Sequence, residues 1–124
     1  MPVKRDDRDP EALLPLTPAM FHILLALADG DRHGYAIGVE VDRQTEGRVK
    51  IGPGTLYGLV KRLLADGLIL ETDERPDPEF DDERRRYYRL TDFGRRVASA
   101  EAARLEALVT TARARNLLPR GSMS

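Results

Sequence analysis

The chain has 124 residues, of which 41% are apolar and 33% charged, and its formal net charge is −1. This length suits one domain, and a modest apolar fraction with so much charge predicts a core that is completed by burial against a second copy. Without cysteine, a long apolar run or an apolar N-terminus, the sequence predicts a cytoplasmic protein with no disulfide, thiolate metal site, membrane-spanning helix or secretory signal.

The charges are unevenly distributed along the chain. Between Glu71 and Glu83 the sequence holds eight acidic residues and one base, Arg75, and the run Arg84-Arg85-Arg86 follows directly. A near-neutral protein still presents a basic surface to nucleic acid when its acids are gathered elsewhere. The overall charge therefore does not exclude DNA binding.

Residues 1–15 alternate charges and prolines without periodicity, which predicts a disordered or loosely attached arm. A first helix is expected after Thr17, because threonine is a good N-cap and Pro18 suits the first helical position. The residues from Met20 to Ala28 are nearly all apolar, as in a helix surrounded by core, and Asp29-Gly30-Asp31 ends it.

Two further helices are expected next. The second runs from Gly34 to Thr45, with an apolar side of Tyr35, Ile37 and Val41 and a polar side of Glu40, Arg43 and Gln44. The third is opened by Gly52-Pro53-Gly54 and ends at Gly67. Its apolar residues recur at the spacing of one buried helix face, namely Leu56, Leu59, Val60, Leu63 and Leu64.

A β-hairpin with a long acidic tip is expected after the third helix, from strands at Leu68–Leu70, extended by Thr72, and at Tyr87–Leu90. Thr91 then caps a final helix that runs to about Asn116. The apolar stripe of this helix has the spacing of a helix–helix contact and comprises Ala98, Ala102, Leu105, Leu108, Val109 and Ala112. The sequence thus predicts a mainly α fold with a small β-hairpin, in which a winged helix-turn-helix domain (16–91) precedes a C-terminal dimerisation helix (92–116) and a tail (117–124).

The outer face of the third helix is both small and basic. A turn of about 100° per residue places Gly54, Gly58, Lys61 and Ala65 outside, with Thr55, Tyr57 and Arg62 on the flanks. Two glycines cost an exposed helix roughly 1 kcal/mol each, a cost that is useful where the backbone must enter a DNA major groove. Free N–H groups at the helix start, the Thr55 hydroxyl and the Tyr57 phenol suit contacts with phosphates or bases. The alternative is an ordinary exposed helix with a weakened first turn.

The wing arginines Arg84, Arg85 and Arg86 enter the second strand, where a winged helix commonly touches phosphates or the minor groove. The nearby acidic residues offer them intramolecular salt bridges instead. Both interpretations remain open at the level of sequence.

No catalytic or metal-binding set is apparent. The two histidines, His22 and His33, have no cysteine to join them in a metal site, and the serines form no arrangement with a base and an acid. No Gly-rich phosphate loop is present. The sequence therefore predicts no enzyme, no metal and no cofactor.

Several short motifs between Leu16 and Gly94 together resemble those of the PadR family of bacterial transcriptional regulators. In chain order they are Leu16-Thr17, His33-Gly34-Tyr35, Pro53-Gly54-Thr55-Leu56-Tyr57, Lys61-Arg62-Leu63, Gly67-Leu68-Ile69 and Arg86-Tyr87-Tyr88-Arg89-Leu90-Thr91 with Gly94. The resemblance implies a repressor that binds an inverted-repeat operator as a homodimer through the helix that starts near Pro53. Gly54, Thr55 and Tyr57 inherit the role of recognising the operator, and Tyr35 that of contacting the DNA backbone. The single helix after the wing implies the short subfamily, in which this helix mediates dimerisation.

The predicted partners are double-stranded DNA and a second copy, and a small-molecule effector is left open. Some short members of the family bind flat aromatic drugs between subunits through a tryptophan, and this chain has none. Two other functions are considered: a winged-helix module that binds protein without sequence-specific DNA contact, and a ligand-binding protein with vestigial DNA affinity. A strong salt dependence of DNA affinity separates the regulator from the first of these.

Overall fold

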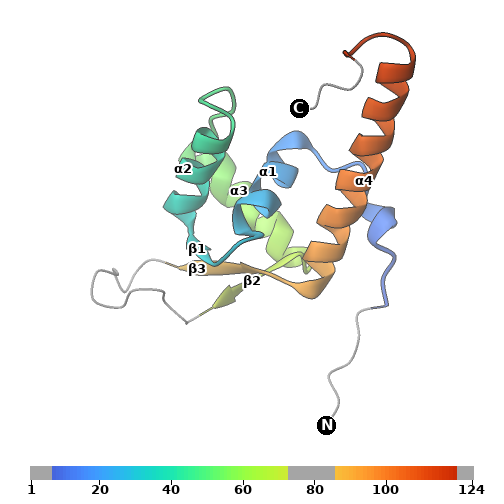
Figure 1. The fold of residues 1–124 in the computed structure, drawn as a ribbon. Coiled ribbons are helices and arrows are strands. Elements are labelled where there is room, and N and C mark those ends of the chain that lie inside the picture. The colour runs from blue at the N-terminus through green and yellow to red at the C-terminus, as the bar shows by residue number, and fades with distance from the viewer. Residues whose placement is uncertain (1–6, 73–85, 120–124) are drawn as a thin grey trace.

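The computed structural model describes residues 7–72 and 86–119 (Figure 1). Its elements follow one another as η1 (Pro10–Leu13), α1 (Pro18–Leu27), β1 (Arg32–His33), α2 (Gly34–Gln44), α3 (Pro53–Ala65), β2 (Ile69–Thr72), β3 (Tyr87–Leu90) and α4 (Asp92–Ala114). This order confirms the predicted winged helix-turn-helix followed by a long C-terminal helix.

Side-chain caps determine where α1 and α4 begin. The Thr17 hydroxyl accepts the backbone N–H of Met20 at 3.2 Å at the start of α1. The Thr91 hydroxyl accepts the backbone N–H of Gly94 at 2.8 Å at the start of α4. Each cap satisfies a donor that the helix itself leaves unpaired, so both helices begin where the sequence predicted.

The sheet has three strands rather than the expected two, in the antiparallel order β1-β3-β2. β2 and β3 form the predicted hairpin. β1 joins the other edge of β3, where Arg32 lies opposite Tyr88. A strand of two residues has no sequence period, and contacts with distant residues hold it: Asp31, just before β1, accepts a hydrogen bond from Nη2 of Arg89 at 2.9 Å. The third strand is therefore a tertiary feature.

The core lies between α1, α2, α3, the sheet and the first half of α4. Its largest fully buried side chains are Ile23, Leu24, Ile37, Val41, Val60, Leu63, Leu68 and Val97. Of the stripe predicted for the third helix, Leu56, Val60 and Leu63 are buried, and Leu59 and Leu64 are half-buried against the same core. The helical periodicity predicted for that segment is confirmed.

α4 is longer than the core that it covers. Its buried residues all lie in its N-terminal half and are Phe93, Gly94, Val97 and Glu101. A Cβ on Gly94 would overlap the backbone oxygen of Leu68, so this close contact between α4 and the start of the wing requires glycine. Beyond Glu101 the helix continues to Ala114 and rises clear of the winged core (Figure 1).

The N-terminal segment corrects one prediction. Residues 1–6 lie outside the described residues, but residues 7–15 are not a loose arm, since they include η1, which packs on α4 (Figure 1). The Arg8 guanidinium lies 4.0 Å from the ring centroid of Phe93, and its Nη1 donates to the backbone oxygen of Asp66 at 2.8 Å. These contacts join residues far apart in the chain and leave no periodic pattern, which is why composition alone predicted a loose segment.

The burial of two side chains on α2 is the opposite of what the sequence predicted. Tyr35, expected on the apolar side, is exposed, whereas Glu40, expected on the polar side, is buried. Nε of Arg43 donates to Glu40 at 3.0 Å, and Nη2 of Arg32 lies 3.7 Å from the same carboxylate. The Arg43 hydrogen bond, with the Arg32 charge beside it, holds the pKa of Glu40 below its usual range. The carboxylate is buried because it is paired.

Candidate nucleic-acid interface

The outer face of α3 is as small and as exposed as the sequence predicted. The exposed residues of α3, on this face and on its flanks, are Pro53, Gly54, Thr55, Tyr57, Gly58, Lys61, Arg62 and Ala65. A Cβ built on Gly54 or Gly58 would meet no atom within 4 Å, so the fold itself requires glycine at neither position. Because Gly58 costs the helix interior roughly 1 kcal/mol relative to alanine, its presence favours close approach of the backbone to something outside the chain.

The first turn of α3 has no side-chain cap. Its N-cap is Gly52, which has no side chain to accept an N–H group, whereas Thr17 caps α1 and Thr91 caps α4. The N–H groups of this turn lie at the positive end of the helix dipole. Such an end suits a phosphate oxygen.

Two tyrosines come together from α2 and α3. Tyr57 lies over Gly34 at the start of α2, where a Cβ would stand 2.5 Å from the Tyr57 hydroxyl oxygen. Tyr35, which follows Gly34, is 72% exposed. Both phenols line one hollow between α2 and α3. The structure thus brings together two residues that the sequence predicted to contact DNA.

His33 holds the start of α2 in place, a role that the sequence did not predict. Its Nδ1 accepts the backbone N–H of Ala36 at 3.2 Å and so caps the helix. Its ring stacks on Tyr35 with 6.3 Å between centroids and meets Tyr87 of β3 edge-on at 5.4 Å. His33 therefore positions Tyr35 and joins α2 to the sheet. Only the polar character of His33 just before the helix could have indicated a cap.

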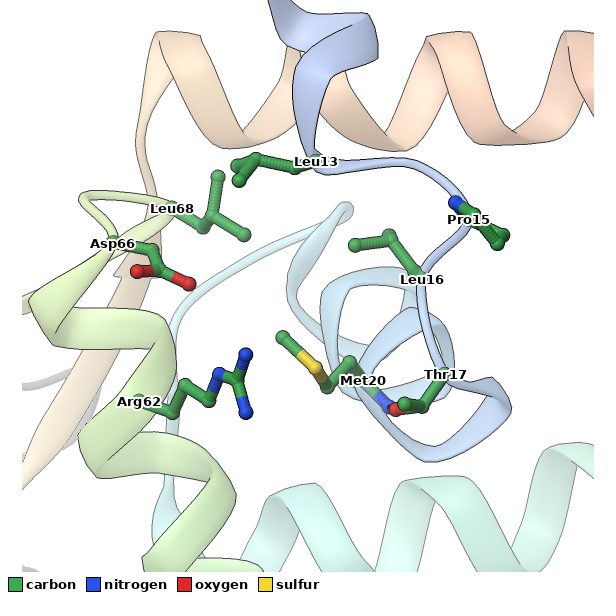
Figure 2. Close-up of a pocket in the computed structure, with 8 residues that line it drawn as sticks. All are labelled: Leu13, Pro15, Leu16, Thr17, Met20, Arg62, Asp66 and Leu68. Carbon is green, nitrogen blue, oxygen red and sulfur yellow. The ribbon is translucent and has the colours of Figure 1, made fainter.

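Lys61 and Arg62 diverge on α3. Lys61 is exposed on the outer face, whereas Figure 2 shows the Arg62 guanidinium directed into a hollow of about 120 Å³ between the N-terminal segment, the start of α1 and the end of α3. Apolar walls from Leu16 and Met20 flank it there (Figure 2). The structure therefore separates Arg62 from the tyrosines with which the sequence grouped it.

The wing arginines are described only in part. Arg84 and Arg85 lie outside the described residues. Arg86, just before β3, is 70% exposed and forms an ion pair with Glu71 of β2 at 3.5 Å. An exposed pair of this kind contributes about 0–1 kcal/mol, so Arg86 could exchange Glu71 for a phosphate at little cost.

Tyr88 of β3 is buried, with 4% of its surface exposed. Burial, and next the Glu71 carboxylate and the Tyr57 phenol, raise the pKa of Tyr88 above the ordinary value of 10.0.

The apolar stripe predicted on the last helix is divided between two environments. Ala98 packs against the core of its own chain, and Leu105 and Ala112 are half-buried. Ala102, Leu108 and Val109 are exposed, Leu108 by 55% and Val109 by 36%. Other parts of the described chain cover these last two side chains only in part.

Within residues 7–72 and 86–119, no group of three or more histidine, aspartate or glutamate side chains is placed to hold a metal ion. No helix in these ranges combines the length and the apolarity that a membrane span needs.

The fold is a winged helix-turn-helix, made of the helices α1 to α3 and a small antiparallel sheet, with α3 exposed. Many proteins that regulate transcription have this fold. The family described as "Transcriptional regulator PadR-like family" matches residues 23–100, and the chain belongs to this family. Membership confirms the resemblance drawn from the short motifs, and it confirms the prediction of a regulator rather than an enzyme.

Two relatives are similar in sequence. The transcriptional regulator Rv3488 of Mycobacterium tuberculosis is 37% identical over 87 residues, which cover 70% of this chain and 75% of the relative. An uncharacterized 37.1 kDa protein in transposon Tn4556 of Streptomyces fradiae is 39% identical over 84 residues, or 68% of this chain. The match spans only 22% of the length of the transposon protein.

The solved structures that share the fold include two regulators of transcription. A transcriptional regulator from Clostridium thermocellum has a TM-score of 0.64 and 26% identity, over 76% of this chain and 85% of that chain. A PadR-like transcription factor from Bacteroides fragilis has a TM-score of 0.60 and 25% identity, over 77% and 86% of the two chains. These similarities agree with the winged-helix fold.

Proposed function

We propose that this chain binds an inverted-repeat operator in double-stranded DNA as a homodimer and represses transcription. The outer face of α3 carries the proposal, because Gly54 and Gly58 leave the helix backbone uncovered and its first turn has no side-chain cap. A major groove about 12 Å wide admits such a helix, and the uncapped N–H groups then face a phosphate.

The exposed side chains around this face have chemistry that suits the two parts of DNA. The Thr55 hydroxyl and methyl suit base edges. Tyr57 and Tyr35 offer phenol groups to phosphates, and Lys61 offers charge. Phosphate contacts position the protein, and base contacts select the sequence.

Of the basic residues beside this face, the wing arginines are assigned to DNA contact and Arg62 is not. Arg86 reaches a phosphate after it releases Glu71, and the same role is proposed for Arg84 and Arg85. Arg62 is left out of the proposed DNA surface, because its guanidinium is directed into the hollow of Figure 2.

A second copy of the chain is the proposed partner of the exposed half of α4. Full burial of an exposed leucine or valine contributes roughly 1.5–3 kcal/mol, and Leu108 and Val109, which are 55% and 36% exposed, gain the corresponding fraction of this. Two-fold symmetry then places one α3 in each of two major grooves, with half-sites about one helical turn, or a multiple, apart.

An effector held between the subunits changes the distance between the two α3 helices and so shifts the operator-compatible population. Because the proposed function requires access to DNA, we propose a cytoplasmic location.

Fluorescence anisotropy tests the proposal. Labelled DNA from upstream of the gene, and genomic fragments selected by binding, are compared with a scrambled duplex over a range of salt. We expect selective binding in which log Kd rises with log salt by about 0.9 per phosphate neutralised. Binding that is weak, unselective and independent of salt would instead favour a protein-interaction module.

Single substitutions test which residues of α3 contact DNA. Tyr57→Phe removes one hydroxyl and should weaken binding, and Lys61→Ala should weaken it on all sequences and lower the salt slope by about 1. Leu25→Ala, an exposed apolar position on α1, is the matched control and should bind as wild type does. Wild-type affinity in both Tyr57→Phe and Lys61→Ala would refute the assignment of α3.

A further inference from the structure

A hollow between α2 and α3, here called the α2–α3 pocket, is lined by apolar side chains that contacts with phosphate would not need. It measures about 380 Å³, within the range of roughly 300–1,000 Å³ typical of small-molecule pockets. Val39 of α2, Ile51 of the connection and Leu56 of α3 form apolar walls. Tyr35 and Tyr57 also line it.

Val39 is an unusual surface residue for α2. It is 49% exposed, although it directly precedes Glu40, which is buried. The two side chains are thus the reverse of what burial of apolar groups alone would give. Exposed apolar side chains that gather around a hollow with polar groups at its edge are typical of ligand-binding grooves.

Gly38 keeps the α2–α3 pocket open. It lies inside α2 and has no positive φ. A Cβ there would make ordinary contacts, at 3.8 Å from Cδ2 of Leu56 and 4.0 Å from the backbone oxygen of Ile51. Neither the backbone nor the packing therefore requires glycine, which costs the helix roughly 1 kcal/mol relative to alanine. The missing side chain leaves room for an occupant.

We propose that the α2–α3 pocket binds a small, uncharged, amphipathic molecule of one or two rings, and that this molecule competes with DNA. The apolar walls and the two phenol rings suit an aromatic body. The ionic side chains in the lining, Asp42 and Lys50, have opposite charges, so the pocket favours neither an anion nor a cation. These groups and the phenols also offer hydrogen-bond partners to one hydroxyl, amide or ring N–H of the ligand.

Competition follows because Tyr35 and Tyr57 belong to both surfaces. A ligand packed against their rings occupies the place where DNA would approach them. If the probe stands at ten times its own Kd, strict competition raises the apparent Kd for DNA about elevenfold. The binding site itself is independent of the proposed function, and only the release of DNA rests on it.

The test uses the full chain, labelled with ¹⁵N, and indole as an uncharged probe, with benzoate and benzamidine as anionic and cationic counterparts. We expect saturable shifts of backbone amides confined to α2, the connection and the start of α3, with indole bound about tenfold or more tighter than either ion, a difference of about 1.4 kcal/mol. Anisotropy then measures displacement of DNA by indole.

Two variants locate the site. Gly38→Leu fills the pocket and should abolish indole binding while DNA binding remains. Val39→Asn, at an exposed position where folding is not at stake, should weaken indole about tenfold through lost apolar contact, about 1.4 kcal/mol. Leu25→Asn, an exposed apolar position on α1, is the matched control and should bind indole as wild type does.

Shifts that do not saturate, or that persist unchanged in both pocket variants, would overturn the proposal. Loss of DNA binding in Gly38→Leu, with no indole binding by wild type, would also overturn it and assign the pocket to DNA. Saturable indole binding with no displacement of a selectively bound operator overturns the competition but leaves the proposed function standing. If no DNA binds at all, the proposed function fails, while the amide shifts still decide whether the pocket binds its ligand.

Discussion

Gly54, Gly58 and Gly94 look alike in the sequence and have different neighbours in the structure. A Cβ on Gly94 would overlap the backbone oxygen of Leu68, whereas one on Gly54 or Gly58 would meet no atom within 4 Å. Gly94 is therefore a packing requirement of the fold, and the two glycines of α3 are not. Their cost to the helix points to a requirement imposed from outside, and substitution separates the two cases.

Gly58→Ala should make the protein more stable and a weaker DNA binder. Alanine in place of glycine inside a helix stabilises it by roughly 1 kcal/mol, and nothing in the described chain opposes the added methyl. The same methyl, held against DNA in the groove, costs on the order of 1–3 kcal/mol as overpacking. Thermal unfolding and anisotropy measure the two effects, and an unchanged DNA affinity would contradict close approach at this position.

Gly34→Ala should affect Tyr57 more than the fold. The new Cβ would stand 2.5 Å from the Tyr57 hydroxyl oxygen, so the end of this side chain must move. Because Tyr57 is half-exposed, we expect a small change in Tm and a loss of DNA affinity at least as large as that of Tyr57→Phe. Wild-type affinity in Gly34→Ala would show that the position of Tyr57 over α2 is not needed.

At the scale of elements, an ion pair within α4 also fastens the helix to the N-terminal segment. Glu101 is 2% exposed, and Nε of Arg104 donates to it at 2.7 Å. The Arg104 hydrogen bond, helped by the Arg104 charge and the backbone N–H of Leu16, holds the pKa of Glu101 below its ordinary value of 4.5. Because the pKa is lowered on folding, this carboxylate stabilises the fold above pH 4.5, and its contribution is lost as the pH falls through the lowered pKa.

Glu101→Gln should lower Tm at neutral pH, and the difference from wild type should shrink as the pH falls below 4.5. A loss of about 1 kcal/mol corresponds to a decrease in Tm of roughly 2–8 °C for a domain of this size. Glu106→Gln, at an exposed glutamate of the same helix, is the control and should match wild type at every pH. A Tm difference for Glu101→Gln that is constant with pH would exclude the charge as its cause.

At the scale of the whole molecule, the winged core and the exposed half of α4 differ in how far their apolar side chains are buried. The core buries its apolar side chains within one chain, whereas Leu108 and Val109 remain 55% and 36% exposed in the described residues. In the proposed dimer, a second copy would cover this half of α4 in both chains and would set the distance between their α3 helices. Assembly and DNA binding should therefore be lost together.

Leu108→Glu should convert the proposed dimer to a monomer and reduce operator affinity, because it buries an unpaired carboxylate in the interface. Size-exclusion chromatography with light scattering gives the mass, and circular dichroism checks that the winged core stays folded. Thr110→Glu adds the same charge on another side of the exposed helix and should remain dimeric. A wild-type monomer, or an unchanged mass in Leu108→Glu, would rule out this interface.

Most of the helical framework could be predicted from the sequence, because its signals are local. Thr17 and Thr91 cap the helices that follow them, and the repeat of Leu56, Val60 and Leu63 faces the core. The exposed face of α3 followed from the same repeat. These features depend on residues three or four positions apart, which the sequence shows directly.

The remaining features follow from packing, because they depend on residues that are distant in the chain. Glu40 is buried on a face predicted to be polar since Arg32 reaches it, and Arg62 turns toward the N-terminal segment rather than toward Tyr57. The α2–α3 pocket exists only once two helices lie together around Gly38. Local sequence signals are sufficient to predict the order of elements, the family motifs and the outward face of α3. Packing determined which side chains share that surface, because a periodic pattern specifies the side of a helix but not the neighbour that it meets.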